Sequence, residues 1–433
     1  MKNRWMVALA GTVVMICLGT VYSWSTFTQP LIASFGWTNT TTTWTFALTI
    51  LFLGIGSVIG GRWQDQAGPR PVVVTGAILW GIGNILAGLG TARFGAWWIY
   101  LTYGVIGGIG LGLGYITPVA VVTKWFPDMR GLASGMVVMG FGLGAFFYNN
   151  LLKSIPAFAE VARQSQTIVD ARAVSKVLMD PQQVHTLTMT FFWSGVVYLV
   201  VGGICALYLS NPPTQAAAST STPAPGSSDF TPAMAMRTWQ FYVLWLMLFL
   251  NVTAGILFIS NAVPIMRELT GITQARALAT YGFLALFNGL GRFFWGAVSD
   301  RIGRRMAYVL IYGTQVAIFF TVGHLHPLYL VAALFAIVLL DYGGGFGTMP
   351  SFTADYYGTK FMGLIYGWIL LAWGVGGVVG PIFVAKVKDR TGSFTGALPV
   401  IAVILIIALI LPIVIRKPAP PEAAGLAVSP AGA

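Results

Sequence analysis

Two ionisable residues lie inside long apolar stretches, where a charge requires an explanation. Arg292 is the only charged residue of LFNGLGRFFWG (286–296), and Asp341 is the only one of IVLLDYGGGFG (337–347). A charge near the centre of a membrane helix costs at least about 2.5–3.5 kcal/mol, so it usually marks the path of a substrate or ion. A guanidinium stays charged and presents a planar fork of donors that matches a carboxylate. We therefore predict that Arg292 binds a small carboxylate, the alternative being an arginine that only pairs with a neighbour or extends to the headgroups.

The depths of these two residues in their helices agree. At 1.5 Å per residue, Arg292 lies roughly 22 Å and Asp341 roughly 21 Å from the outer ends of their spans. The matched depths allow the two side chains to pair. An arriving carboxylate would then compete for Arg292 and leave Asp341 free to take a proton, so that proton and anion would travel together. The alternatives are a purely structural ion pair and an aspartate that faces a water-filled vestibule.

Polar and aromatic side chains are expected to complete an otherwise apolar site, which would hold a small ligand by shape and a few hydrogen bonds. Asn288 lies one helical turn before Arg292 and therefore on the same face. The other predicted substrate-binding residues are aromatic: Tyr22, Trp24, Tyr115, Tyr342, Phe346 and Trp373. For any one of these rings, packing in the core or against lipid explains the residue equally well.

The composition is that of an integral membrane protein. Charged residues make up 8% of the 433-residue chain and hydrophobic residues 56%, whereas an ordinary soluble domain has about 25% charged residues. The 24 basic residues outnumber the 12 acidic ones, but they lie between apolar segments rather than on one face, so nucleic-acid binding is not expected. The two cysteines both fall in apolar segments and give neither a disulfide framework nor a metal site.

About twelve apolar runs, each of about 20 residues and thus long enough for a bilayer core, divide the chain into two sets of six. They begin near Trp5, Trp44, Pro71, Trp97, Gly131 and Leu187, and near Trp239, Ala277, Met306, Pro327, Phe361 and Phe394. We predict an all-α membrane protein with one six-helix bundle in residues 1–210, a cytoplasmic linker rich in Pro, Ser, Thr and Ala in 211–236, and a second bundle with a short tail in 237–433. The bias of Lys and Arg among the loops favours both termini in the cytoplasm, and we expect the protein in the cell (inner) membrane.

A repeated motif indicates that the two halves are equivalent. Residues 61–70 (GRWQDQAGPR) and 296–305 (GAVSDRIGRR) both read G-x-x-x-D-x-x-G-x-R, and each follows the second span of its half. The matching residues are Gly61, Asp65, Gly68 and Arg70 in the first copy, and Gly296, Asp300, Gly303 and Arg305 in the second. The first glycine of each copy permits close helix packing. Each aspartate is expected to face the positive N-terminal end of a helix, one starting near Gly358 and the other near Gly131.

These motifs resemble those of the major facilitator superfamily, whose members carry this sequence after the second span and often after the eighth. The resemblance implies twelve helices in two pseudo-symmetric bundles, a cytoplasmic gate held shut by the motif residues, and alternating access to a site at the membrane midplane. The stretches 19–25 (GTVYSWS), 124–144, 342–350 (YGGGFGTMP) and 355–381 narrow the resemblance to the oxalate/formate antiporters and the related monocarboxylate transporters.

In the antiporters of that branch, an arginine in the eighth span works with a lysine in the eleventh to hold a dicarboxylate. Here the eleventh span contains no lysine, and Trp373 stands at the corresponding place. One fixed positive charge suits one carboxylate, so we predict a secondary transporter of monocarboxylates such as lactate, pyruvate or acetate, coupled to protons. The alternatives are anion exchange of the oxalate/formate type and export of a drug or neutral solute.

Other classes of function find no support in the sequence. A membrane-embedded enzyme would need a cluster of nucleophile, base or metal-binding residues in the spans, and the sequence contains no such cluster. The glycine-rich stretch 104–114 lacks the G-x-G-x-x-G register of a nucleotide site, and no phosphate-binding loop occurs, so no cofactor is expected. The duplicated gate motif argues against a receptor or channel. The expected partners are a small carboxylate, protons and lipid, and the protein is expected to be a monomer.

Overall fold

The structure, a computed structural model, describes residues 2–171, 179–213, 229–391 and 395–419. Within these residues all regular structure is helical. Ten helical segments are long and apolar enough to cross a membrane. The helix that carries Arg292 and a shorter apolar helix near the C-terminus complete two sets of six. The predicted all-α membrane fold is therefore confirmed.

The helices of the first half follow the predicted apolar runs. They are α1 (Arg4–Gly19) with α2 (Trp24–Phe35), α3 (Asn39–Ala67), α4 (Pro69–Phe94), α5 (Ala96–Ile99) with α6 (Gly108–Trp125), α7 (Arg130–Ser154), and α9 (Pro181–Val197) with α10 (Gly203–Tyr208). Short 3₁₀ or π turns join the paired segments. An additional helix, α8 (Pro156–Ala171), lies between α7 and α9.

The second half has the same order of long helices. They are α13 (Trp239–Thr270), α14 (Gln274–Ile302), α15 (Arg304–Thr321), α16 (Leu328–Tyr357), α17 (Met362–Thr391) and α18 (Ala397–Val414). The short helix α12 (Pro232–Met236) lies inside the predicted linker, of which residues 214–228 are outside the described part of the chain. The boundaries at residues 210 and 236 stay a prediction.

Two glycines explain how each motif loop turns so tightly. Gly68 separates α3 from α4, and Gly303 separates α14 from α15, each as a single residue between two helices. Their φ angles are +82° and +86°, a region that residues with a Cβ atom adopt at a cost. The second glycine of G-x-x-x-D-x-x-G-x-R is therefore the residue at which the chain reverses direction.

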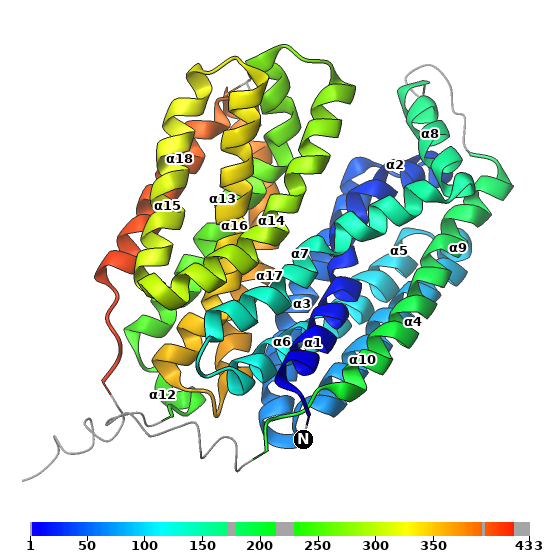
Figure 1. Cartoon of the computed structure of the whole chain (residues 1–433). Coiled ribbons are helices and arrows are strands. Elements are labelled where there is room, and N and C mark those ends of the chain that lie inside the picture. The colour runs from blue at the N-terminus through cyan, green and yellow to red at the C-terminus, as the bar shows by residue number, and fades with distance from the viewer. Residues whose placement is uncertain (1, 172–178, 214–228, 392–394, 420–433) are drawn as a thin grey trace, which may run out of the picture.

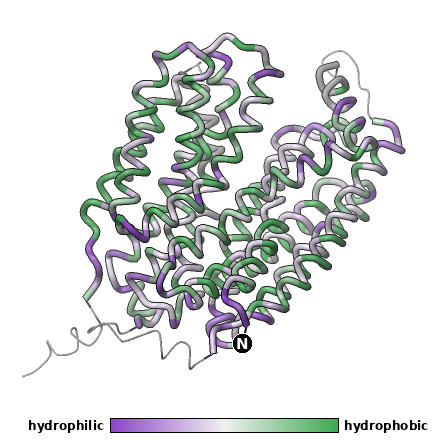
Figure 2. The backbone as a smooth tube through the Cα atoms, in the orientation of Figure 1, coloured by the Kyte–Doolittle hydropathy of each residue, from purple (hydrophilic) through white to green (hydrophobic). Residues whose placement is uncertain are grey.

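The two halves lie side by side and approach each other most closely at one end (Figure 1). We call this end, at which the N-terminus lies, the N-face. The halves meet along two seams, α3 against α17 and α7 against α14, and they diverge toward the opposite end. Hydrophobic residues dominate the middle of the helices, whereas many hydrophilic residues lie near their ends (Figure 2). This distribution is the one a membrane-spanning bundle requires.

Candidate functional site

The site is built around Arg292 in the middle of α14. Its side chain is fully buried, with no exposed surface. Nη1 donates a hydrogen bond to the Val138 carbonyl of α7 at 3.3 Å. The guanidinium carbon lies 5.0 Å from the ring centre of Phe346 and 5.7 Å from that of Phe141, in the range of cation–π contacts. Arg292 therefore links a helix of one half to a helix of the other.

The other two nitrogens of the guanidinium remain available. Nε and Nη2 are buried and have no hydrogen-bond partner, and no ion pair to Arg292 occurs among the described residues. These two N–H groups lie on the same edge of the planar guanidinium, which is the edge that can hold both oxygens of one carboxylate. A buried charge without an ionic partner is costly, so this arrangement favours binding of an anion.

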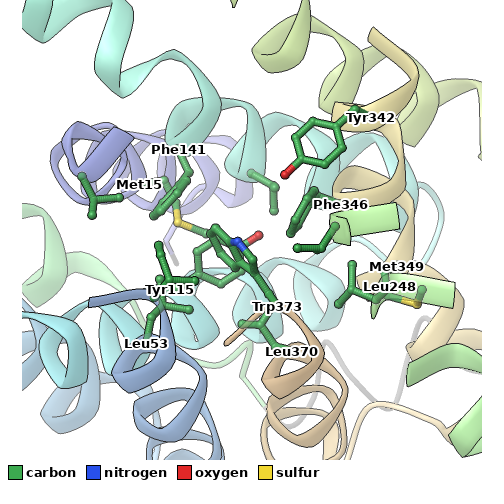
Figure 3. Close-up of a cluster of buried hydrophobic side chains, with 14 of the residues drawn as sticks. Met15, Leu53, Tyr115, Phe141, Leu248, Tyr342, Phe346, Met349, Leu370 and Trp373 are labelled. Carbon is green, nitrogen blue, oxygen red and sulfur yellow. The ribbon is translucent and has the colours of Figure 1, made fainter. Parts of the chain in front are cut away.

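Aromatic rings from both halves cluster next to Arg292, and Figure 3 shows five of them: Tyr115, Phe141, Tyr342, Phe346 and Trp373. The Trp373 ring of α17 is the centre of the cluster, with ring centroids 5.0 Å from Phe346 and 5.5 Å from both Tyr115 and Phe141. Tyr22 lies 6.1 Å from the same indole. The hydroxyl oxygens of Tyr22 and Tyr115 are buried without a hydrogen-bond partner. The cluster thus combines apolar walls with a few unsatisfied polar groups.

Two further predicted residues lie at this site. Tyr342 packs against Phe346, with ring centroids 5.5 Å apart. The buried Oδ1 atom of Asn288 has no partner, and a Cβ atom added at Gly343 would lie 3.1 Å from it. The structure therefore gathers Asn288, Tyr22, Tyr115, Tyr342, Phe346 and Trp373 around or next to Arg292.

Trp24 lies elsewhere, which corrects the prediction that it faces the substrate. Its indole nitrogen donates to the Thr42 carbonyl at 2.9 Å, and its ring packs against Tyr103 and Phe191 inside the first half. Successive residues of a helix point about 100° apart, so a residue two positions after Tyr22 points to nearly the opposite side.

The predicted pair between Arg292 and Asp341 is also wrong. The Asp341 carboxylate accepts hydrogen bonds from Trp295 Nε1 at 2.8 Å and from Thr314 Oγ1 at 2.6 Å. It therefore faces α14 and α15 rather than the aromatic cluster. Tyr342, the next residue, points into the cluster, and adjacent side chains of a helix point about 100° apart. The similar depths of Arg292 and Asp341 in their helices therefore did not determine where the Asp341 side chain points.

The motif aspartates lie at the N-face, at the starts of two helices from the opposite half. Asp65 accepts from the backbone N–H groups of Gly363 and Leu364 at 3.1 and 2.8 Å. Asp300 accepts from those of Gly131 and Leu132 at 2.9 and 2.8 Å. Each carboxylate thus caps a helix and interacts favourably with the positive end of the helix dipole.

The second gate contains an ionic network that the first gate lacks at the matching position. Arg304 bonds to Asp300 at 2.6 Å and to Asp355 at 2.9 Å, and Arg130 of the first half bonds to the same Asp355 at 3.0 Å. In the first copy of the motif, the residue that corresponds to Arg304 is Pro69, which has no charge. The two gates are therefore chemically unequal.

Three of the remaining motif residues, Gly61, Gly296 and Arg305, make structural contacts. A Cβ atom at Gly61 or Gly296 would collide with the carbonyl of Gly363 or Gly131 across the seam. Arg305 donates to the carbonyls of Pro412 and Ile413 at the end of α18, at 3.1 and 2.6 Å. Arg70 is exposed.

Several participating residues were not predicted from the sequence. Phe141 and the Val138 carbonyl complete the surroundings of Arg292, Trp295 and Thr314 hold Asp341, and Asp355 connects two arginines. Each of these contacts joins segments far apart in the chain, so no local spacing reveals them. The charge of Asp355, at the end of an apolar span, was the one available signal.

Gly142 gives a first testable consequence. A Cβ atom there would lie 3.0 Å from Arg292 Nε and 2.7 Å from the Gly289 Cα atom. We expect Gly142→Ala to block the free edge and to raise the KM for a carboxylate substrate about tenfold, or about 1.4 kcal/mol. The matched control is Gly282→Ala on α14, where the added methyl group meets no atom within 4 Å. Equal KM values for the two variants in reconstituted uptake would contradict this geometry.

Comparison with known proteins agrees with this architecture. A family model described as the Major Facilitator Superfamily matches residues 9–381. The oxalate:formate antiporter of Oxalobacter formigenes is 26% identical over 401 residues, which are 92% of this chain and 88% of that protein. The apicoplast pyruvate carrier 1 of Toxoplasma gondii is 24% identical over 461 aligned positions, covering 85% of this chain and 81% of its own. The crystal structure of the transporter FucP in an outward conformation has a TM-score of 0.70 at 16% identity, covering 94% of this chain and 97% of FucP.

Proposed function

The chain belongs to the major facilitator superfamily, and from this premise we propose that it carries small monocarboxylates across the membrane together with protons. Its relatives are transporters, so a transport function follows from the family itself. The substrate, the coupling to protons and the roles of individual residues are our proposal.

The observation that carries the proposal is the free edge of Arg292. Two buried donors, Nε and Nη2, lie side by side without a partner, which is the complement of one carboxylate group. A neutral solute or a cationic drug would leave this charge uncompensated, at a cost of several kcal/mol. The site therefore favours an anion over the neutral or drug-like substrates of other members of the superfamily.

The size of the substrate follows from the charges and rings around Arg292. Arg292 and Asp341 are the only fully buried charged side chains among the described residues, and Asp341 points away. One cation beside a wall of aromatic rings suits a single carboxylate with a short apolar or keto-substituted chain. The similarity to a protein named a pyruvate carrier agrees with this substrate class.

Alternating access supplies the transport mechanism. With the N-face in the cytoplasm, as the distribution of loop charges indicates, the gates at Asp65 and Asp300 close the cytoplasmic side. Breaking these caps lets the halves rock about the site at Arg292, which lies on one of the two seams.

The decisive experiment uses purified protein in liposomes, with labelled lactate, pyruvate, acetate, formate and oxalate, each with and without an imposed pH gradient. We expect uptake of a monocarboxylate that rises when the outside is acidic. Uptake of none of these anions would refute the proposed function.

Anion exchange without protons is the second candidate, and the similarity to the oxalate:formate antiporter over 92% of the chain favours it. Exchange predicts uptake that needs an anion inside the liposome and does not respond to the pH gradient. The two candidates are therefore separated by the same experiment.

Trp373 is expected to determine how many carboxylates the site accepts. We expect Trp373→Lys to change the preference between oxalate and lactate by about tenfold in favour of oxalate, because a second cation can bind the second carboxylate. Trp373→Phe, which removes the indole without adding charge, is the control. The measurement is competition between the two labelled acids, and equal selectivity in both variants would count against this role.

A further inference from the structure

We propose that Asp341, Trp295 and Thr314 form a proton-binding site that is distinct from the carboxylate site at Arg292. The inference rests on the proposed function for one point, that protons move with the substrate. It replaces the predicted pair between Asp341 and Arg292 with a self-contained site between α14, α15 and α16.

The carboxylate is buried among neutral donors. Asp341 is 1% exposed, its Oδ1 accepts from Trp295 Nε1, and its Oδ2 accepts from Thr314 Oγ1. In the described part of the chain, no basic side chain lies within ion-pairing distance of it. An ionised carboxylate in a membrane helix is costly without a cation, whereas the protonated form carries no charge.

The charged groups of the surrounding helices are directed elsewhere. Arg292 lies between Phe141 and Phe346, and Tyr308 and Tyr312 of α15 donate to the carbonyls of Gly345 and Met247. Among the side chains that the structure describes, the remaining charged residues of α16 and of the helices that contact it lie toward helix ends: Lys124, Arg130, Lys153, Arg267, Glu268, Arg276, Asp300, Arg301, Arg304, Arg305 and Asp355. The state of Asp341 therefore depends mainly on its own hydrogen bonds.

Thr314 can satisfy both protonation states. Its Oγ1 lies 2.6 Å from Asp341 Oδ2 and also 2.7 Å from the Leu310 carbonyl oxygen. A hydroxyl has one hydrogen and can also accept. When Asp341 is ionised, Thr314 donates to it. When Oδ2 binds a proton, Asp341 donates to Thr314, and the Thr314 hydrogen turns to the Leu310 carbonyl.

Trp295 determines which carboxylate oxygen takes the proton. An indole N–H can only donate, so Oδ1 must remain an acceptor and the proton belongs on Oδ2. The Trp295 ring packs directly on Gly344, at which a Cβ atom would collide with the ring. A change in the protonation state of Asp341 can thus be accommodated by the rotation of one hydroxyl group, without the movement of a heavier group.

The proton site and the substrate site share one pair of helices. Trp295 lies three residues after Arg292 and is its neighbour on the surface of α14. A Cβ atom at Gly343 or Gly347 of α16 would collide with the backbone carbonyl of Asn288 or Arg292. Because α14 and α16 are in direct backbone contact, a change at the Asp341 hydrogen bonds acts on the same unit that holds the carboxylate.

The test measures proton binding and transport separately. Infrared spectra of the purified protein should be recorded over a range of pH. They should contain a protonated-carboxyl band that disappears as the pH rises and that is absent in Asp341→Asn. Thr314→Val should shift the midpoint of this band by about one pH unit upward, because the ionised form loses a charge-assisted hydrogen bond, the stronger of the two. Thr314→Ser, which keeps the hydroxyl, should leave the midpoint unchanged. An unaltered titration in Asp341→Asn would overturn the proposal.

Liposome assays then test the coupling. A gradient of one pH unit can drive about tenfold accumulation at one proton per anion. We expect Asp341→Asn, a neutral side chain of nearly the same shape, to abolish this accumulation while lactate exchange at equal pH persists, because exchange requires no net movement of protons. Wild-type-like accumulation in this variant would also overturn the proposal. Failure of the wild type to exchange any monocarboxylate would instead refute the proposed function, and the infrared result would stand independently.

Discussion

Replacing Arg292 with lysine is expected to lower kcat/KM for monocarboxylate uptake by about 100-fold, or about 2.7 kcal/mol. Lysine keeps the charge but cannot present two parallel N–H groups to one carboxylate. Its shorter reach also removes the bond from Nη1 to the Val138 carbonyl and the contacts with Phe141 and Phe346. Arg292→Ala should abolish uptake, because the anion would then enter a buried site with no cation.

The matched control for this prediction is Arg276→Lys, at the exposed start of α14. It makes the same chemical change on the same helix away from the site, so uptake should be unchanged. Protein level and thermal stability should be measured for all three variants. Carboxylate uptake by Arg292→Lys at the wild-type rate would remove the basis of the proposed function.

Replacing Asp300 with alanine is expected to shift the equilibrium between closed and open N-face about 30- to 100-fold toward the open state. The change removes two charge-assisted hydrogen bonds to the start of α7, each contributing about 1.5 kcal/mol or less in this part-buried position. It also deprives Arg304 of one of its two carboxylate partners. Amide hydrogen exchange at Gly131 and Leu132 should accelerate correspondingly, and net uptake should fall because the closed state is depopulated.

Asp65→Ala is the matched variant in the other half. It removes the same two kinds of backbone contact from the start of α17, at Gly363 and Leu364, but leaves no arginine without a partner. We expect a smaller acceleration of exchange at these two amides than Asp300→Ala produces at its own. Equal effects of the two substitutions would mean that the Arg304 network adds nothing to closure.

The sequence predicted those parts of the structure that repeat along the chain or depend on residue type alone. Apolar runs located the spans, and a buried arginine identified its own helix as part of the site. Asn288 could be expected on the same face as Arg292 because a spacing of four residues fixes the relative direction of two side chains on one helix, and its role in binding stays a prediction.

Spacing along the sequence does not predict which side chains of different helices point toward one another. Asp341 and Arg292 lie at similar depths, yet the rotation of α16 about its axis turns Tyr342 rather than Asp341 toward the cluster. Trp24 failed for a different reason: it lies two residues after Tyr22 along the same helical segment, so the two side chains point to nearly opposite sides, and only Tyr22 faces the cluster. Contacts such as Arg130 with Asp355 depend on how the two halves dock, which a single sequence does not specify.

The difference between Pro69 and Arg304 has a consequence for the order of events during transport. Two seams hold the N-face together, and among the described side chains linked arginines and aspartates reinforce the α7–α14 seam alone. The α3–α17 seam, capped by Asp65, should therefore separate at a lower free-energy cost. We expect opening to begin at the α3–α17 seam and to proceed as a rotation about α7 and α14. The protein would then pass through an asymmetric intermediate, in which one seam is open and the other is still closed.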